Sequence, residues 1–270
     1  MNKSVAMPPS RAFSIVEVLV VLGVLAILAG LLSPVLARQR RAARESVCLT
    51  QLRSHSSVIA AYAGDNRDSW PMACRVDPRG AGAIYRDHPV APFGIVGGVW
   101  HFAILDAYAY QPFHASLICP DDDITPTERD SAASVLARSP DTVGGTLDRR
   151  ISMAMYLSPV ALDPERPVWR PDVWITQRQA DVVYPAAKAG LVERSPFHDA
   201  SAQRIGAVWR TSSSWRFTMT ACDGSASSRE SANAIPGVLP EGIRRRETEV
   251  VERELAKFDY TAWGVRGRDW

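Results

Sequence analysis

The chain has 270 residues, a formal net charge of +2 and 46% hydrophobic residues, which is enough apolar material for one sizeable core. This composition excludes a disordered, collagen-like or disulfide-scaffold protein. The 31 basic residues are interleaved with 29 acidic residues along the chain. A polybasic nucleic-acid-binding protein is therefore not expected.

The first forty residues divide into a short basic segment and a long apolar one. Residues 1–12 contain Lys3 and Arg11 and no acid, and Glu17 is the only charged residue between Phe13 and Ala37. A helix over 13–37 would be about 37 Å long, which is enough to cross a bilayer. A carboxylate inside such a span normally has a partner or a function. The pattern predicts a membrane-spanning helix that carries one functional acid.

The residues around this boundary resemble the class III leader of type IV prepilins and type II secretion pseudopilins. Ala12 precedes Phe13, and Glu17 is the fifth residue counted from Phe13. The resemblance implies that a prepilin peptidase cleaves between Ala12 and Phe13 and methylates the new N-terminus at Phe13. It also implies that Glu17 pairs with the N-terminal amine of a neighbouring subunit during assembly. Pro34 lies where pilins commonly carry a helix-kinking proline, while Ala12 replaces the more usual glycine.

The charges that flank the span favour the opposite orientation from the leader. A count of positive residues alone would place the C-terminal domain in the cytoplasm, because more of them follow the span than precede it. These residues are Arg38, Arg40, Arg41 and Arg44 after the span, and Lys3 and Arg11 before it. The leader resemblance implies a single-pass inner-membrane protein with a cytoplasmic N-terminus and a periplasmic domain, which is the orientation we expect. The alternative is an uncleaved signal anchor whose Glu17 reaches the interface.

Helical spacing continues beyond the span, through residues 38–64. One apolar stripe recurs at intervals of three and four residues and consists of Cys48, Leu52, His55, Ile59 and Tyr62. The spacing predicts one long helix that ends near Gly64, whose second half lies on a globular domain. His55 belongs to this stripe and is predicted to be a packed core histidine, not a ligand.

The rest of the chain predicts loops followed by strands. Residues 65–98 are rich in Gly, Pro and Asp and are expected to be an extended loop, and 100–110 a short helix. Strands are expected at 151–157, 188–193, 204–210 and 215–221, and Asp223–Gly224 is a hairpin-turn signal. A long helix followed by clustered strands predicts an α+β fold with an antiparallel sheet packed on the helix.

This architecture is also that of pilins, and the resemblance extends to bacterial pseudopilin-like proteins related to the type II secretion major pseudopilin. The matching stretches are 48–53, 62–71, 117–123, 152–156 and the strand that ends in 222–224. We therefore expect a periplasmic pilin-like domain over residues 65–229. Residues 230–270 are expected to form an extension, with an amphipathic helix that covers the domain surface.

The sequence contains no pattern of an active site. The five histidines are scattered, and no HExxH, GxSxG or phosphate-binding glycine loop is present. We therefore expect no enzymatic activity and no cofactor. The one metal candidate is a run of hard oxygen ligands for Ca²⁺ at Asp121, Asp122 and Asp123, and the alternative is a simple turn cluster without a metal.

The four cysteines leave several possibilities open. Cys48 and Cys119 could pair in an oxidising periplasm, with Cys74 and Cys222 as a second bridge. The sequence does not choose among the three connectivities, and buried thiols without any bridge are an alternative.

Together these features predict a structural subunit of a type II secretion pseudopilus or a type IV filament, supporting protein secretion. Its expected partners are other pilin or pseudopilin subunits, the prepilin peptidase and the inner-membrane assembly platform. One alternative is a minor pilin for adhesion or DNA uptake. An alternative of another class is a signal-anchored periplasmic enzyme or binding protein.

Overall fold

The computed structural model describes residues 14–73, 75–76, 83–85, 88–90, 100–104, 114–122, 149–168, 170–193, 195–199, 215–238, 258 and 261–270. The chain divides into two compact units, residues 1–43 and 44–270. The predictions for Ala12, Phe13, Cys74, Asp123, the strand at 204–210 and the helix between 243 and 255 lie outside the described residues.

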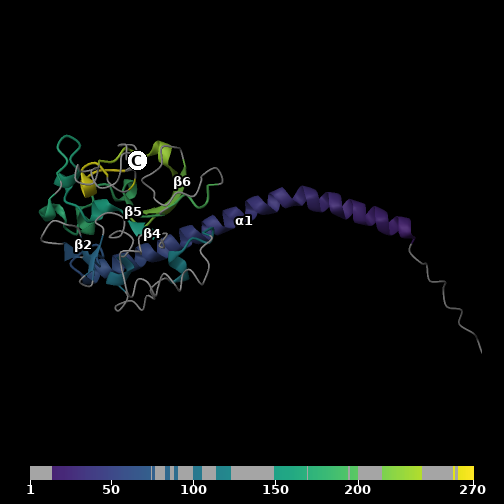
Figure 1. Cartoon of the computed structure of the whole chain (residues 1–270), viewed down its shortest axis with the longest axis horizontal. Coiled ribbons are helices and arrows are strands. Elements are labelled where there is room, and N and C mark those ends of the chain that lie inside the picture. Colours follow the sequence, from purple (N-terminus) through teal and green to yellow (C-terminus); the bar gives the residue numbers. More distant parts are fainter. Residues whose placement is uncertain are drawn as a thin grey trace, which may run out of the picture. The chain divides into compact units, whose positions relative to one another are not determined.

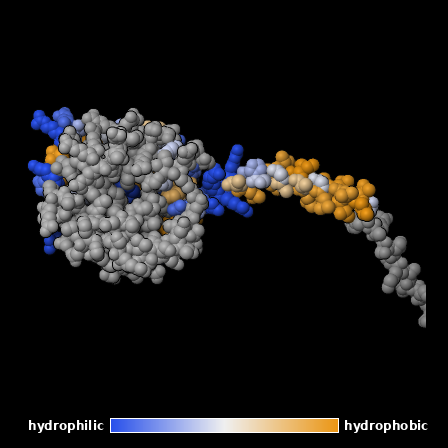
Figure 2. Space-filling view, viewed as in Figure 1, coloured by the Kyte–Doolittle hydropathy of each residue, from blue (hydrophilic) through white to orange (hydrophobic). Residues whose placement is uncertain are grey.

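The long helix is present and begins within two residues of the predicted boundary. Helix α1 spans Ile15–Asp65, and Pro34 lies inside it (Figure 1). In the first unit every described residue, from 14 to 43, is exposed. Figure 2 shows apolar side chains along the outer part of this helix, and the sequence is almost entirely apolar up to Ala37. A helix that is apolar on all sides and buries none of them within its own chain is suited to a lipid or protein environment.

The second half of α1 belongs to the second unit and has a single buried face. Its buried residues follow helical spacing and are Cys48, Leu52, His55, Ile59 and Ala63. The predicted stripe is therefore confirmed at four positions. At the fifth, Ala63 is buried and Tyr62 is only partly buried. His55 is a core residue as predicted, because its ring packs edge-on against Trp100 and its Nε2 lies 2.9 Å from the carbonyl oxygen of Ser116.

A four-stranded antiparallel sheet forms the centre of the second unit. Its strands are β4 (Arg149–Ile151), β5 (Ala189–Glu193), β6 (Arg216–Ala221) and β7 (Ala226–Glu230), in that order. Asp223–Gly224 lies between β6 and β7, where Gly224 has a φ of +85°, a value that glycine adopts without strain. The helix and this sheet make the α+β, pilin-like fold that was expected.

Two expectations for regular structure were wrong in detail. The predicted strand at 151–157 ends at Ile151, and Met153–Met155 form a short 3₁₀ helix instead. The apolar residues at alternate positions of this segment predicted a strand with one exposed and one buried face. Every residue from 151 to 157 is buried, so no such pair of faces exists. Residues 65–98 were expected to lack regular structure, yet they contain a small antiparallel sheet of β1 (Arg75–Val76), β2 (Ala83–Tyr85) and β3 (His88–Val90).

The central sheet is covered on both faces. One hydrophobic cluster includes Leu52 and Ile59 of α1 and Leu191 of β5. The other joins Phe217 and Met219 of β6 to residues near the C-terminus, among them Phe258 and Trp270. Successive strand residues point to opposite faces, so the two clusters lie on different sides of the sheet.

The last ten residues are tied to the sheet by a buried ion pair. The Nζ of Lys188 lies 3.2 Å from a carboxylate oxygen of Asp269, and both side chains are almost fully buried. Asp269 also accepts a hydrogen bond of 2.8 Å from the backbone N–H of Ala189 in β5. Removing one member of a buried pair leaves an uncompensated charge, so loss of either side chain should strongly destabilise the docked C-terminus.

Candidate functional site

Four side chains from four separate segments meet beneath the second half of α1. Their ligand atoms all lie within 4.8 Å of one another, and all four residues are buried. We call this group the sulfur cluster, and it consists of Cys48, Cys119, Glu193 and His198. The sulfur atoms of its two cysteines are 3.1 Å apart and are not joined in a disulfide. The Nε2 atom of His198 lies 3.3 Å from the sulfur of Cys119 and 3.5 Å from Glu193 Oε1.

Regular secondary structure positions the members of the sulfur cluster. Cys48 lies on the buried stripe of α1, and Cys119 follows the short 3₁₀ helix Ala115–Leu117. Glu193 is the last residue of β5 and pairs directly with Arg149 of β4. The guanidinium of Arg149 donates from NH1 to Glu193 Oε1 at 2.8 Å and from NH2 to the sulfur of Cys48 at 2.9 Å. The cluster therefore links α1 to the sheet through one buried arginine.

The environment shifts the pKa values of these groups in a consistent pattern. A hydrogen bond from Cys119 lowers the pKa of Cys48 to about 6, against the opposing effect of burial. Burial and that same hydrogen bond raise the pKa of Cys119. Burial opposes protonation of His198, but its contacts with Cys48 and Glu193 raise its pKa to about 10. The sulfur cluster therefore favours a thiolate at Cys48, which the nearby Arg149 and the protonated His198 stabilise.

Asp121 is the outer partner of the sulfur cluster. Its Oδ2 lies 2.7 Å from Nδ1 of His198, and its Oδ1 accepts a hydrogen bond of 2.7 Å from Arg44. Both carboxylate oxygens therefore already have cationic or donor partners. The calcium site expected at Asp121, Asp122 and Asp123 stays a prediction. Asp122 is partly buried in the same turn.

The remaining cysteine that the structure describes lies elsewhere. Cys222 directly follows β6, and its backbone N–H donates to the carbonyl oxygen of Lys188 at 2.8 Å. It is not a member of the sulfur cluster and forms no disulfide. The structure thus brings together Cys48 and Cys119 of the four cysteines, and the predicted second bridge stays a prediction.

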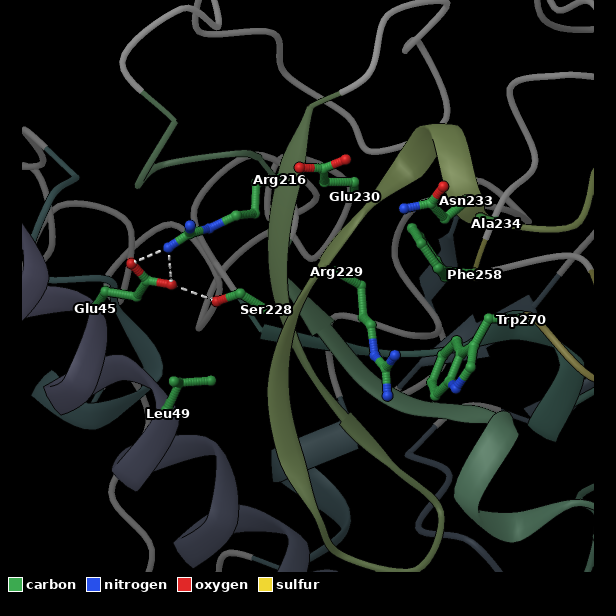
Figure 3. A pocket seen from close by; sticks show the side chains of 10 residues that line it. All are labelled: Glu45, Leu49, Arg216, Ser228, Arg229, Glu230, Asn233, Ala234, Phe258 and Trp270. Atoms are coloured by element: carbon green, nitrogen blue, oxygen red, sulfur yellow. Dashed lines mark hydrogen bonds and ion pairs between the residues drawn. The ribbon is translucent and has the colours of Figure 1, made fainter.

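A surface pocket of about 570 Å³ lies beside β6 and β7 (Figure 3). On one side Arg216 forms an ion pair with Glu45, which also accepts a hydrogen bond from Ser228. On the other side the guanidinium of Arg229 lies 4.7 Å from the ring centroid of Trp270. The lining residues are Glu45, Leu49, Arg216, Ser228, Arg229, Glu230, Asn233, Ala234, Phe258 and Trp270. Both signs of charge are present, so the pocket has no electrostatic preference for an anion or a cation.

The N-terminal end of α1 contains a second arrangement of functional residues. The carboxylate of Glu17 accepts a hydrogen bond of 2.9 Å from the backbone N–H of Ser14. The hydroxyl of Ser14 in turn accepts one of 3.3 Å from the N–H of Val16. These reciprocal contacts form a capping box, which satisfies two N–H groups that a helix start leaves without partners. Glu17 therefore has a local structural role at the start of the span.

Comparison with protein families identifies the same segment. Residues 7–33 match the family model described as the prokaryotic N-terminal methylation motif. The chain has a prepilin-like N-terminus. No curated protein and no solved structure matches the chain.

The motif and the helix carry three consequences for this prepilin-like protein. The helix that begins at Ile15 is long and apolar enough to cross a membrane. No residue in its most apolar stretch is buried. Together with the motif it indicates a chain anchored in the inner membrane by a single span. A motif of this kind implies processing by a prepilin peptidase and assembly with other pilin subunits.

Sequence reasoning about the prepilin-like chain found the N-terminal residues but missed the sulfur cluster. Glu193 lay at the end of a predicted strand, His198 was one of the five scattered histidines, and neither was singled out as a ligand. No short motif joins them to Cys48, because their spacing along the chain matches no metal signature. The Ser14 to Glu17 spacing, by contrast, is a capping-box pattern that could have been read directly.

Proposed function

We propose that this chain is a structural subunit of a type II secretion pseudopilus or a type IV filament. In this proposal the peptidase cleaves between Ala12 and Phe13 and methylates Phe13. The mature subunit then assembles through the exposed half of α1. The observation that carries the proposal is the match of residues 7–33 to the methylation motif, at the start of a helix whose apolar first half is fully exposed.

The chemistry of the first helical turn supports this role. A carboxylate in a membrane span costs about 2.5–3.5 kcal/mol at the centre on insertion scales and less near an interface, so Glu17 at the start of the span still benefits from a partner. Before cleavage Glu17 obtains one partner, the N–H of Ser14. After cleavage the new amine at Phe13 of a neighbouring subunit supplies a cationic partner. This exchange directs subunits to a defined stagger, because only one register places the amine beside Glu17.

The apolar half of α1 supports assembly by packing. Its surface carries small residues at Gly23, Ala26, Ala29 and Gly30 among the large aliphatic ones. No heavy atom lies within 4 Å of a Cβ built at Gly23 or Gly30, so both positions are open to a neighbouring helix. Small residues allow helix backbones to approach closely in a membrane or filament core.

The second unit would then be a periplasmic domain displayed on the filament. The expected partners are homologous subunits, the prepilin peptidase and the inner-membrane assembly platform. In this proposal the domain acts as a structural module. The burial of the thiol, histidine and carboxylate cluster supports a structural role for that cluster.

One observation favours a second candidate, a signal-anchored binding protein. The pocket of about 570 Å³ is of a size that accommodates a small molecule, and two aromatic residues line it. In that case the chain keeps its N-terminal segment and does not assemble into a filament.

The decisive experiment is mass spectrometry of the N-terminus, with and without the prepilin peptidase. The filament proposal expects a mature chain that begins with N-methyl-Phe13 only when the peptidase is present. An intact N-terminus in both conditions contradicts the proposal and favours the anchored binding protein.

The orientation of the domain requires its own measurement. A reporter enzyme that is active only in the periplasm, fused after Trp270, should be active in the full chain. A reporter that is active only in the cytoplasm serves as the matched control. Activity of the cytoplasmic reporter alone would contradict the periplasmic assignment and with it the filament proposal.

A further inference from the structure

The donor atoms of the sulfur cluster have the composition of a zinc site. Two thiol sulfurs, one imidazole nitrogen and one carboxylate oxygen converge within 4.8 Å. Zn²⁺ binds these ligand types, and its structural sites are closed by four protein ligands in a tetrahedron. A chain that buries two cysteines, a histidine and a glutamate at one point has assembled the complete ligand set from distant segments.

The spacing of the donor atoms fits such a tetrahedron. Metal–ligand distances of about 2.0–2.3 Å give ligand–ligand edges of roughly 3.3–3.8 Å. Three of the six donor–donor separations are 3.1 Å between the sulfurs, 3.3 Å from Cys119 to His198 and 3.5 Å from His198 to Glu193, and all six are within 4.8 Å. These three separations lie within about 0.7 Å of such edges. We propose that the sulfur cluster is a structural zinc site.

Every ligand of this site has an outer partner that orients it. Nδ1 of His198 lies 2.7 Å from Asp121, which leaves Nε2 directed at the cluster. The backbone N–H of Asp121 donates to the sulfur of Cys119 at 3.4 Å, and that of Thr218 donates to Oε2 of Glu193 at 3.1 Å. Arg149 donates to Cys48. Carboxylate–histidine contacts and hydrogen bonds of this kind fix ligand geometry in metal sites.

The charges of the cluster also balance around a divalent ion. Two thiolates and one carboxylate carry three negative charges in a site that excludes water. A divalent metal and the buried guanidinium of Arg149 supply three positive charges. A buried charge is tolerated only when it is paired, so the presence of Arg149 at 0% side-chain exposure fits this balance.

The site would join the second half of α1 to the rest of the second unit. Cys48 comes from α1, Cys119 from the turn that follows Ala115–Leu117, Glu193 from β5, and His198 from residues 195–199. One ion would hold these four segments together and add its binding free energy to folding. This inference goes beyond the proposed function, because it concerns the second unit in either processed or unprocessed protein.

The test uses the full chain purified in detergent under reducing conditions. Elemental analysis should find about one zinc per chain, and growth with cobalt should give the visible absorption of a tetrahedral Co²⁺ with thiolate ligands. Cys119→Ser should lose the metal. Cys222→Ser, which changes a cysteine outside the cluster, should keep it. The N-terminal processing assay is unaffected by either result, so the two proposals fail independently.

A second variant covers the case in which Cys119→Ser does not fold. Asp121→Asn keeps all four ligands but weakens the outer contact to His198, so its zinc affinity should fall about 10- to 100-fold in competition with a chromophoric chelator. Two results would overturn the proposal. One is wild-type chain with thiols and no metal, and the other is a Cys48–Cys119 disulfide seen as a linked peptide without reduction.

Discussion

The two halves of α1 show how one helix can serve two environments. Residues 14–43 are all exposed and almost entirely apolar up to Ala37. In the second half only a stripe is buried, and many of the other positions are polar or charged. The first half gains nothing from its own chain and depends on lipid or on neighbouring subunits. The second half obtains its stability from the sheet, so a substitution should act on assembly in one half and on folding in the other.

The largest effect is expected at Glu17. Glu17→Gln keeps a side chain that accepts a hydrogen bond at the helix start but removes the negative charge. Membrane insertion should persist while co-assembly with other subunits falls to background, because a neutral amide does not pair with an N-terminal ammonium. Cross-linking between subunits and recovery of sheared filaments measure this loss. Glu165→Gln, at an exposed position in the second unit, is the matched control.

The sharpest contrast between the halves comes from the same substitution at two leucines. Leu52 is fully buried, whereas Leu25 is 55% exposed. Leu52→Ala should lower the free energy of unfolding of the second unit by about 2–5 kcal/mol, through lost burial and a residual cavity. Leu25→Ala should change it by less than about 0.5 kcal/mol. Denaturant unfolding followed by tryptophan fluorescence measures both, and equal losses would contradict the division of the helix.

A pH dependence should distinguish the buried half. Burial lowers the pKa of His55 to about 4, while its hydrogen bond to Ser116 opposes this shift. The unfolded chain takes up a proton near pH 6.5 and the folded chain does not. The neutral His55 ring therefore contributes its full share to the free energy of unfolding above pH 6.5. This contribution is lost as the pH falls towards 4.

The size of this loss in the free energy of unfolding follows from the shift in the pKa of His55. It reaches up to about 3 kcal/mol, at 1.36 kcal/mol per pKa unit. His55→Leu should remove this part of the pH dependence, so the stability difference between wild type and variant should narrow as the pH falls. Unfolding curves at several pH values between 7.5 and 4 test this. Parallel curves for the two proteins would show that His55 does not titrate in this way.

The smallest effect is expected at the junction between the halves. Glu45 accepts contacts from Arg216 and Ser228, but the Arg216 side chain is 48% exposed. Solvent screens such a pair, so Glu45→Gln should cost no more than about 1 kcal/mol in the free energy of unfolding. The loss should shrink in high salt. A loss as large as that of Leu52→Ala would mean that this pair, and not the buried stripe, holds the helix to the sheet.

Much of the fold could be predicted where one segment carries its own pattern. The long helix, β5, β6 and the Asp223–Gly224 turn each follow from a pattern of residues inside one continuous segment. All four are present. The prediction at 151–157 was wrong because a run buried on both faces loses its contrast between faces. The partnership of the C-terminal residues with the sheet also had no local pattern, since it depends on Lys188 meeting Asp269.

The sequence by itself determined the membrane signal of this protein, because that signal is local. Ala12, Phe13 and Glu17 lie within six residues, and the apolar run follows directly. Only the tertiary structure decided that Cys48 meets Cys119, 71 residues away, and Arg149, 101 residues away. Such contacts form when a helix stripe and cross-strand pairs pack together, and no local spacing in the sequence shows which distant partners this packing selects.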